Sequence, residues 1–161
     1  MKFNHAEIVG NKLIIKGSKS PLPIRITLIA VLLICLMIPI AATFLLMSER
    51  KGPHLGIFLS FLFFWGIGFY LLRIILWNTF GREILTLEDD KISYEADYRF
   101  FIDGKQNIST ENIEVVAIPT QSEATNLGIL VFSNENQHID TVLGAPLDKM
   151  MDIAAEINKR Y

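Results

Sequence analysis

IRITLIAVLLICLMIPIAATFLLM (residues 24–47) and LGIFLSFLFFWGIGFYLLRIILW (residues 55–77) are the two stretches that decide the fold. No charged residue occurs between positions 26 and 47, and the second stretch holds a single charge, Arg73. A helix rises about 1.5 Å per residue, so the first uncharged stretch covers about 33 Å, enough for the roughly 30 Å hydrocarbon core of a bilayer. Because hydrocarbon offers the backbone no hydrogen-bond partners, each stretch is predicted to form a transmembrane helix.

The connection between the two stretches is short and contains Gly52 and Pro53, which together signal a turn. It therefore predicts an antiparallel helical hairpin with both ends on one side of the membrane. Basic residues cluster outside the hairpin, at Lys2, Lys12, Lys16, Lys19, Arg25, Arg82 and Lys91, whereas the connection holds only Arg50 and Lys51. By the positive-inside rule, this distribution predicts a multi-pass protein of the cell (inner) membrane with both termini in the cytoplasm.

Several residues within the helices invite specific predictions. Arg73 lies one turn before Trp77 and is interpreted as an interfacial anchor, with a functional intramembrane charge as the alternative. Pro39 is expected to kink the first helix. Small residues let helices approach closely, and Gly56, Ser60 and Gly68 share one face of the second helix. Their expected partner is the first helix through Ala30, Ala41 and Ala42, with a second copy or another membrane protein as alternatives.

Charge is distributed unevenly along the chain, although the net charge is only −2. Residues 1–25 carry five basic groups and one acidic group, whereas residues 78–161 carry seven basic and fifteen acidic groups. Nucleic acid and anionic lipid headgroups repel an acidic surface, so neither is an expected ligand of the C-terminal part.

Short strands are predicted on both sides of the hairpin. Residues 6–16 form a β-hairpin around Gly10 and Asn11, which is marginal alone and is expected to dock on the C-terminal domain. Residues 82–88 form a strand, and Asp89 and Asp90 form a turn. Alternation of apolar and polar residues over positions 92–102 predicts one long strand. Asp103 and Gly104 then form a hairpin turn, and residues 105–109 return antiparallel.

The rest of the C-terminal part predicts three further strands, at residues 113–118, 127–132 and 138–143. A terminal helix follows Pro146, with Leu147, Met150, Ala154 and Ile157 on its apolar face. The expected fold is a membrane helical hairpin followed by an all-β barrel of six to seven antiparallel strands, capped by an amphipathic helix. The expected domains are the N-terminal segment 1–23, the transmembrane helices 24–47 and 55–77, and the β-domain 78–161.

This arrangement resembles the bacterial membrane-anchored proteins with a PH-like domain, over residues 24–160. The resemblance is carried by Gly81, Arg82 and Glu83 after the second helix, by residues 91–98 and 113–116, and by the closing helix. It implies a seven-stranded barrel capped by a helix, used for interactions at the membrane. Lipid-binding relatives hold phosphate with a basic loop near the first hairpin, whereas residues 87–91 here are acidic, so lipid-phosphate binding is not carried over.

No residue pattern in the sequence predicts catalysis. The three histidines, His5, His54 and His138, fall in three separate segments, and the predicted topology puts His54 across the membrane from the other two. The single cysteine, Cys35, lies in the middle of the first predicted transmembrane helix, so no disulfide framework and no thiolate metal site are expected. No glycine-rich phosphate loop and no hydrolase or zinc-protease motif occurs. We therefore expect no enzyme activity and no catalytic, cofactor or metal site.

The leading hypothesis is an integral membrane protein whose cytoplasmic PH-like domain binds another membrane or cytoplasmic protein, in an accessory or assembly role. The alternative is a lipid-contacting or transport-associated subunit that acts through its transmembrane helices. A membrane-embedded enzyme that uses Arg73 is a third hypothesis. A homo-oligomer is compatible with all three.

Overall fold

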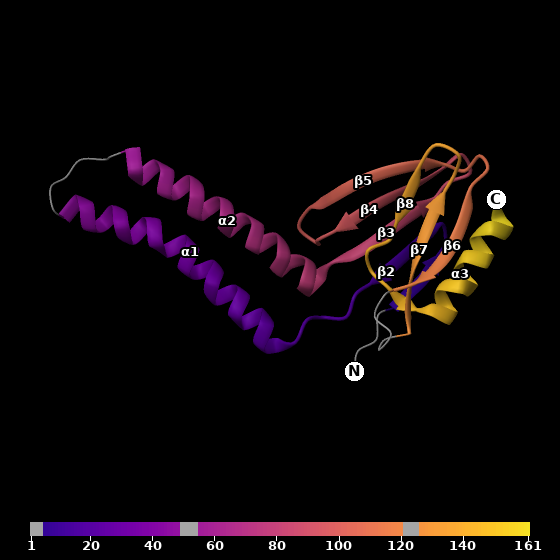
Figure 1. Cartoon of the computed structure of the whole chain (residues 1–161), viewed down its shortest axis with the longest axis horizontal. Coiled ribbons are helices and arrows are strands. Elements are labelled where there is room, and N and C mark those ends of the chain that lie inside the picture. Colours follow the sequence, from indigo (N-terminus) through magenta and orange to yellow (C-terminus); the bar gives the residue numbers. More distant parts are fainter. Residues whose placement is uncertain (1–4, 49–54, 121–125) are drawn as a thin grey trace. The chain divides into compact units, whose positions relative to one another are not determined.

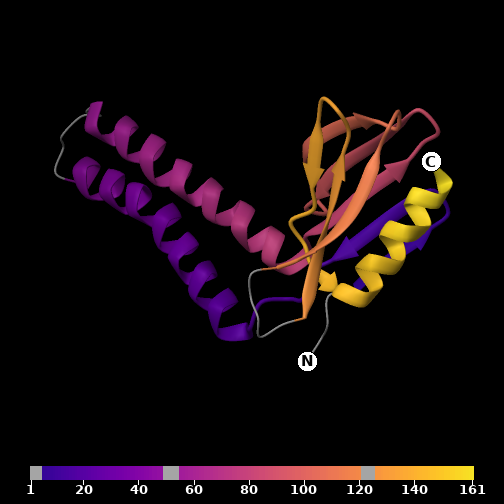
Figure 2. The same cartoon turned by 45° about the vertical axis from the view of Figure 1, so that its right-hand side comes forward.

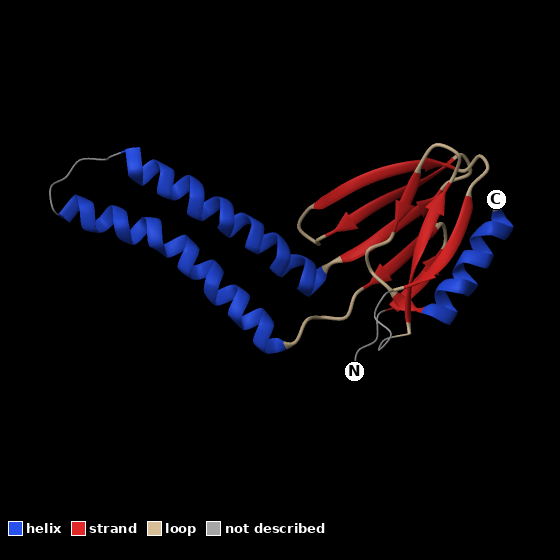
Figure 3. Ribbon diagram, in the orientation of Figure 1, coloured by secondary structure: helices blue, strands red, loops and turns tan. Residues whose placement is uncertain are grey.

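The computed structural model of the chain describes residues 5–48, 55–120 and 126–161. The chain divides into two compact units, a helix unit (Ser20–Thr79) and a β unit (Met1–Lys19 with Phe80–Tyr161). Figure 3 distinguishes the helices of the first from the strands and the C-terminal helix of the second. Each unit is described by itself.

The helix unit consists of α1 (Leu22–Ser48) and α2 (Leu55–Phe80), both long and apolar enough to cross a membrane. Both helices contain the predicted stretches. α1 begins two residues earlier and ends one residue later than predicted, and α2 begins as predicted and ends three residues later. α1 continues through Pro39, and Thr43 Oγ1 donates a hydrogen bond of 2.7 Å to the Pro39 carbonyl oxygen. The predicted connection lies outside the described residues apart from Ser48, the last residue of α1.

Residues shielded from solvent follow one seam along each helix, with spacings of three and four. The seam comprises Leu28, Leu32, Cys35, Pro39, Ala42 and Leu46 of α1, and Ile57, Phe61, Phe64, Gly68, Leu71 and Ile75 of α2. This spacing is typical of helices that pack nearly antiparallel with a small left-handed crossing. The helix pair is therefore held by side chains spread over several turns of each helix.

The prediction about small residues is only partly right. A Cβ at Gly68 would lie 3.5 Å from Leu32 Cδ1 and 3.6 Å from Leu36 Cδ2, so Gly68 does face α1 closely. Gly56 has no such neighbour among the described residues, and Ala30 and Ala41 are exposed. The larger leucine side chains of α1, rather than its alanines, fill the space over Gly68.

Replacing Gly68 with leucine is expected to separate the helices around Cys35, because overpacking a filled contact costs about 1–3 kcal/mol. Cys35 is buried and is the only cysteine, so its reaction with a thiol dye during heating in detergent reports this opening. Gly68→Leu should react at a lower temperature than the parent chain. Gly56→Leu, where the structure shows open space, should match the parent; equal labelling of both variants would contradict the packing.

In the residues of the β unit that the structure describes, there are two antiparallel sheets and one helix (Figure 1). The first sheet has the order β1-β2-β3-β4-β5. Its strands are β1 (His5–Val9), β2 (Lys12–Lys16), β3 (Arg82–Leu87), β4 (Lys91–Asp97) and β5 (Ile102–Ser109). The predicted N-terminal hairpin is thus part of the sheet, since β2 pairs with β3 from Lys12 opposite Thr86 to Lys16 opposite Arg82. The two long helices are inserted between two neighbouring strands.

The predicted turn at Asp103 and Gly104 is wrong. β4 ends at Asp97, and the turn is formed by residues 98–101, closed by the Tyr98 N–H donating to the Phe101 carbonyl oxygen at 3.0 Å. Gly104 has a φ of 62° within β5, where the register with β4 slips by one residue. A glycine with positive φ is what a β-bulge requires, so the same residue chemistry serves a bulge instead of a turn.

The second sheet contains β6 (Glu114–Pro119), β7 (Leu127–Ser133) and β8 (His138–Asp140), with the short β9 (Ala145–Pro146) paired to β7. β8 is shorter than predicted, because after Asp140 the Thr141 Oγ1, not a backbone carbonyl, accepts the Leu130 N–H at 2.8 Å. Part of the predicted loop before β7, residues 121–125, lies outside the described residues.

The closing helix α3 (Leu147–Arg160) begins after Pro146, as predicted, and packs on β6 and β7 (Figure 2). Its buried residues are Met150, Ile153, Ala154 and Ile157, so Ile153 replaces the half-buried Leu147 of the prediction. Asn158 holds the helix to β6 with two hydrogen bonds to Val115, accepting from its N–H at 2.9 Å and donating to its carbonyl at 2.7 Å. These bonds occupy backbone groups of a sheet-edge strand.

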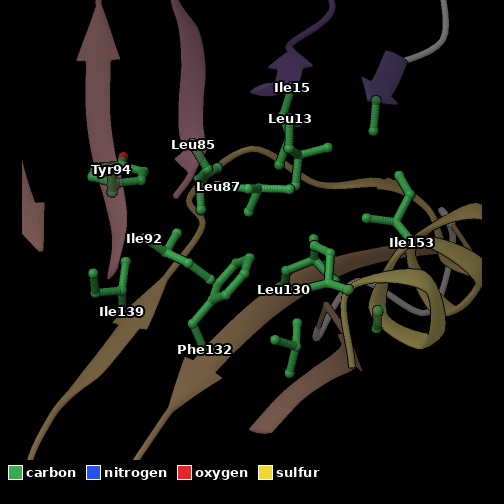
Figure 4. Packing of buried hydrophobic residues seen from close by; sticks show 14 of the residues in the cluster. Leu13, Ile15, Leu85, Leu87, Ile92, Tyr94, Leu130, Phe132, Ile139 and Ile153 are labelled. Carbon is green, nitrogen blue, oxygen red and sulfur yellow. The ribbon is translucent and has the colours of Figure 1, made fainter. Parts of the chain in front are cut away.

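One hydrophobic core lies between the two sheets and α3 (Figure 4). Phe132 is the largest fully buried side chain among the residues that the structure describes, and Leu130 of the same strand is fully buried as well. Figure 4 shows both facing residues of the first sheet and Ile153 of α3. Leu13 and Ile15 of the N-terminal hairpin belong to this core, so the segment before α1 contributes to the stability of the β unit.

Candidate functional site

The histidines do not converge in the part of the chain that the structure describes. His5 on β1 lies with its Nε2 3.2 Å from Glu7 Oε2, and His138 is exposed at the start of β8. His54 lies outside the described residues. Among residues 5–48, 55–120 and 126–161, no group of three or more His, Cys, Asp and Glu side chains could hold a metal ion.

The sequence did not predict that the carboxyl group of Glu83 is buried and hydrogen-bonded inside the β unit. Its side chain is fully buried at the second position of β3. Oε1 accepts hydrogen bonds of 2.7 Å from the Tyr94 hydroxyl and from the Val142 N–H, and Oε2 accepts one of 3.0 Å from the Leu143 N–H. The carboxyl group therefore links β3 and β4 to the segment after β8. The alternation of residues along β3 could have predicted this burial, since Glu83 lies on the same face of the strand as Leu85 and Leu87.

Burial raises the pKa of Glu83 above its ordinary value of 4.5, and the three donors oppose this shift. Burial and the neighbouring Glu83 carboxylate also raise the pKa of the Tyr94 hydroxyl. The fully satisfied geometry is that of a structural clasp, because each carboxyl oxygen is already occupied by donors of the protein itself.

The clasp makes stability depend on pH. Between 4.5 and the raised pKa of Glu83, the folded chain holds a proton that the unfolded chain has lost, so the free energy of unfolding falls as pH rises through this window. Glu83→Gln removes the titration. The difference in urea midpoint between the parent and Glu83→Gln, measured from about pH 4 to about pH 8 on the full chain in detergent, should therefore shift against the parent as pH rises. A difference that is constant over this range would contradict the raised pKa.

A second polar cluster lies where β3 begins and β4 ends. Arg82 places its Nη2 2.6 Å and its Nε 2.7 Å from Asp97 Oδ2. The other oxygen, Asp97 Oδ1, accepts the Arg99 N–H at 2.6 Å. Arg99 adopts a φ of 76°, which is uncommon for a residue other than glycine. Asp97 thus fixes both the sheet end and the turn that follows it.

Part of the outward face of the second sheet is apolar, between Glu114 on β6 and Asp140 on β8. Val116 and Ile118 of β6 are exposed, and their directly paired neighbours on β7 are Val131 and Ile129, which are half-buried. Four β-branched side chains therefore form one continuous patch on the side of the sheet opposite the core, and we call it the β6–β7 patch. Contiguous exposed apolar surface of this kind marks interaction sites more often than scattered apolar residues do.

An open depression of about 530 Å³ lies at the far end of the first sheet, beside the C-terminus. Asp89, Asp90 and Glu111 line it together with Arg160 and Tyr161. Arg160 lies 3.8 Å from the fully exposed Asp89, and the Tyr161 hydroxyl donates to the Glu88 carbonyl oxygen at 2.7 Å. Asp89 therefore faces solvent in the turn between β3 and β4.

No protein-family model, curated protein or solved structure matches the chain.

Proposed function

We propose that the chain is an integral membrane protein whose β unit is a PH-like module that binds another protein at the cytoplasmic face of the membrane. The observation that carries this function is the β6–β7 patch, which presents Val116 and Ile118 outward from a well-packed domain. An accessory or assembly role follows from a binding surface on a membrane-anchored scaffold.

Membrane spanning is supported by the place of the helices in the fold. Lys16 and Arg82 are direct partners in the sheet, so the chain leaves the β unit and returns to it on adjacent strands. Two antiparallel crossings return the chain to the side on which it started. More basic residues flank the outer ends of the two helices than lie in the connection between them, which favours the cytoplasm for that side.

The PH-like assignment is supported by strand order. β2, β3, β4 and β5 are consecutive neighbours in the first sheet, β6, β7 and β8 in the second, and α3 follows. Seven strands in this order with a closing helix agree with the barrel implied by the resemblance, with β1 as an added edge strand. The two long helices then occupy the connection between the first and second strands of the barrel.

Site-specific photocrosslinking in cells tests the binding function. A photoreactive residue in place of Val116 should give one defined adduct with a partner protein. The same residue in place of Met151, an exposed apolar position on α3, should give none. Val116→Asp should abolish copurification of the partner identified from the adduct while the chain remains in the membrane. The same diffuse adducts from both positions would count against the patch.

The second candidate is a subunit that acts through α2, and it rests on Phe58, Phe63 and Phe69, which are exposed on that helix. Lipid contact explains aromatic residues there equally well. The two candidates differ in one result: loss of the partner in a triple Phe→Leu variant, with Val116→Asp having no effect, would favour the helix.

A further inference from the structure

The turn between β4 and β5 exposes apolar side chains at one end of the first sheet. Phe100 is 70% exposed and Ile102 is 48% exposed, although both are apolar members of the alternation over residues 92–102 that predicted one long strand. Tyr98 and Phe101, by contrast, stack on each other at the base of the turn, with ring centroids 4.5 Å apart. We call residues 98–102 the aromatic turn.

The conformation of the aromatic turn is specified by polar contacts. The Arg99 N–H donates to Asp97 Oδ1, and Arg99 takes a positive φ that favours glycine. Strained backbone that the surroundings hold in place is a pointer to function. In this conformation the Arg99 guanidinium lies over an aromatic ring, and the Phe100 side chain is exposed to solvent.

That ring belongs to Phe80, the last residue of α2 and the first of the second segment of the β unit. The Arg99 guanidinium carbon lies 5.0 Å from the centroid of the Phe80 ring, and the Phe100 ring lies edge-on to it at 6.1 Å. Both contacts lie inside the β unit. Figure 1 shows the turn at the end of the sheet where β3 begins.

Phe80 determines how deep in a bilayer the aromatic turn lies, because it is the last residue of α2 and contacts the turn. α2 has 26 residues and is about 39 Å long, which exceeds the roughly 30 Å hydrocarbon core by about 9 Å. Phe80 follows Trp77, whose side chain is typical of the membrane–water interface, by three residues. Phe80, and the side chains in contact with it, therefore fall in the headgroup layer when α2 crosses the membrane.

The charges at the two ends of β4 also favour placing the aromatic turn at the bilayer. The aromatic turn at one end carries Arg99, and the turn at the other end carries Asp89 and Asp90. The seven residues of β4 separate these ends by about 20 Å, more than the Debye length of about 8–10 Å in physiological salt. The acidic end is thus held beyond the strongest repulsion of anionic lipids, although Asp103 remains beside the turn.

We propose that the aromatic turn is a lipid contact: Phe100 and Ile102 enter the headgroup layer of the bilayer, and Arg99 faces the lipid phosphates. Aromatic rings and arginine are the side chains that this layer accommodates best. This placement rests on α2 crossing the membrane as proposed above. It adds a second attachment of the β unit to the bilayer, besides the covalent one through α2.

Tryptophan fluorescence of the full chain in vesicles of equal parts phosphatidylcholine and phosphatidylglycerol tests this contact. Trp65 and Trp77 are the only tryptophans, so Trp65→Phe and Trp77→Phe give a dark background. Phe100→Trp is the reporter. Val9→Trp is the matched control, because Val9 is 56% exposed and lies at the opposite end of the same sheet, opposite Lys12.

Phe100→Trp should be quenched by lipids brominated near the headgroup, and iodide should quench it about threefold less than Val9→Trp. Strong iodide quenching without lipid quenching would overturn the contact. Shielding from both quenchers would also overturn it, because a protein surface would then cover the turn. A third variant that keeps only Trp77 separates the lipid contact of the turn from the membrane crossing of α2. Lipid quenching of Trp77 but not of Phe100→Trp would reject the lipid contact alone. No lipid quenching of Trp77 would reject the membrane crossing.

Discussion

Phe132→Ala is expected to lower the free energy of unfolding of the β unit by about 3–5 kcal/mol, the usual cost of emptying the space of a buried phenylalanine. Phe132 is fully buried on β7 and belongs to the core shared by both sheets and α3. A cavity at this position removes contacts from several elements at once. The loss is expected to be among the largest for any single substitution in the unit.

Urea titration of the full chain in detergent, read by brief proteolysis of the β unit, measures this effect. Tryptophan emission would not report it, because both tryptophans lie in α2. Met151→Ala, at an exposed position of α3, should stay within about 0.5 kcal/mol of the parent. If Phe132→Ala and Met151→Ala unfolded at the same urea concentration, the two sheets would not share a core around Phe132.

Glu83→Ala is expected to cost about 3 kcal/mol. It leaves the Tyr94 hydroxyl and the N–H groups of Val142 and Leu143 without their acceptor, and each unsatisfied buried donor costs about 1–3 kcal/mol. Removing a buried carboxyl group offsets part of that loss, because the group no longer has to leave water.

The same urea titration measures the effect of Glu83→Ala. Glu95→Ala on the outward face of β4 is the matched control and should be nearly silent. Glu83→Gln keeps an acceptor at Oε1 but puts an amide donor opposite the Leu143 N–H, so its cost should fall between the two. A Glu83→Ala variant as stable as Glu95→Ala would contradict the clasp.

The two long helices could be predicted because one physical constraint dominates them. A bilayer-length run without charge has few alternatives, and the structure has helices there. Their contact was harder to predict. Gly56 and Gly68 have suitable spacing, yet of these two glycines Gly68 alone meets α1 closely, because the leucines on α1 decide where a glycine is needed.

The β4–β5 region shows why local signals compete. Asp103 and Gly104 are a favoured turn pair, but Asp97 forms hydrogen bonds with both Arg82 and Arg99 and ends β4 earlier. Arg82 belongs to another strand, and the Arg99 N–H reaches Asp97 while Arg99 has an unusual positive φ. A local sequence pattern shows neither of these features. Gly104 then relieves the resulting one-residue mismatch as a bulge.

The candidate surfaces were less predictable than the fold. The alternation of β3 puts Glu83 on the buried face, but its acceptor role depends on Val142 and Leu143, about 60 residues further along the chain. The exposure of Phe100 follows from the shifted turn. The β6–β7 patch depends on which face α3 leaves uncovered, and this is a property of the assembled unit.

Cysteine labelling tests most directly whether the helical hairpin crosses the membrane with the β unit on the cytoplasmic side. In a Cys35→Ala background, single cysteines replace Lys51 between the helices, Lys12 on β2, and Asn136 between β7 and β8. A membrane-impermeant maleimide added to spheroplasts of a bacterial host should label Lys51→Cys directly, and Lys12→Cys and Asn136→Cys only after permeabilisation. Labelling of Asn136→Cys in intact spheroplasts, or the same behaviour at all three positions, would contradict the proposed crossing.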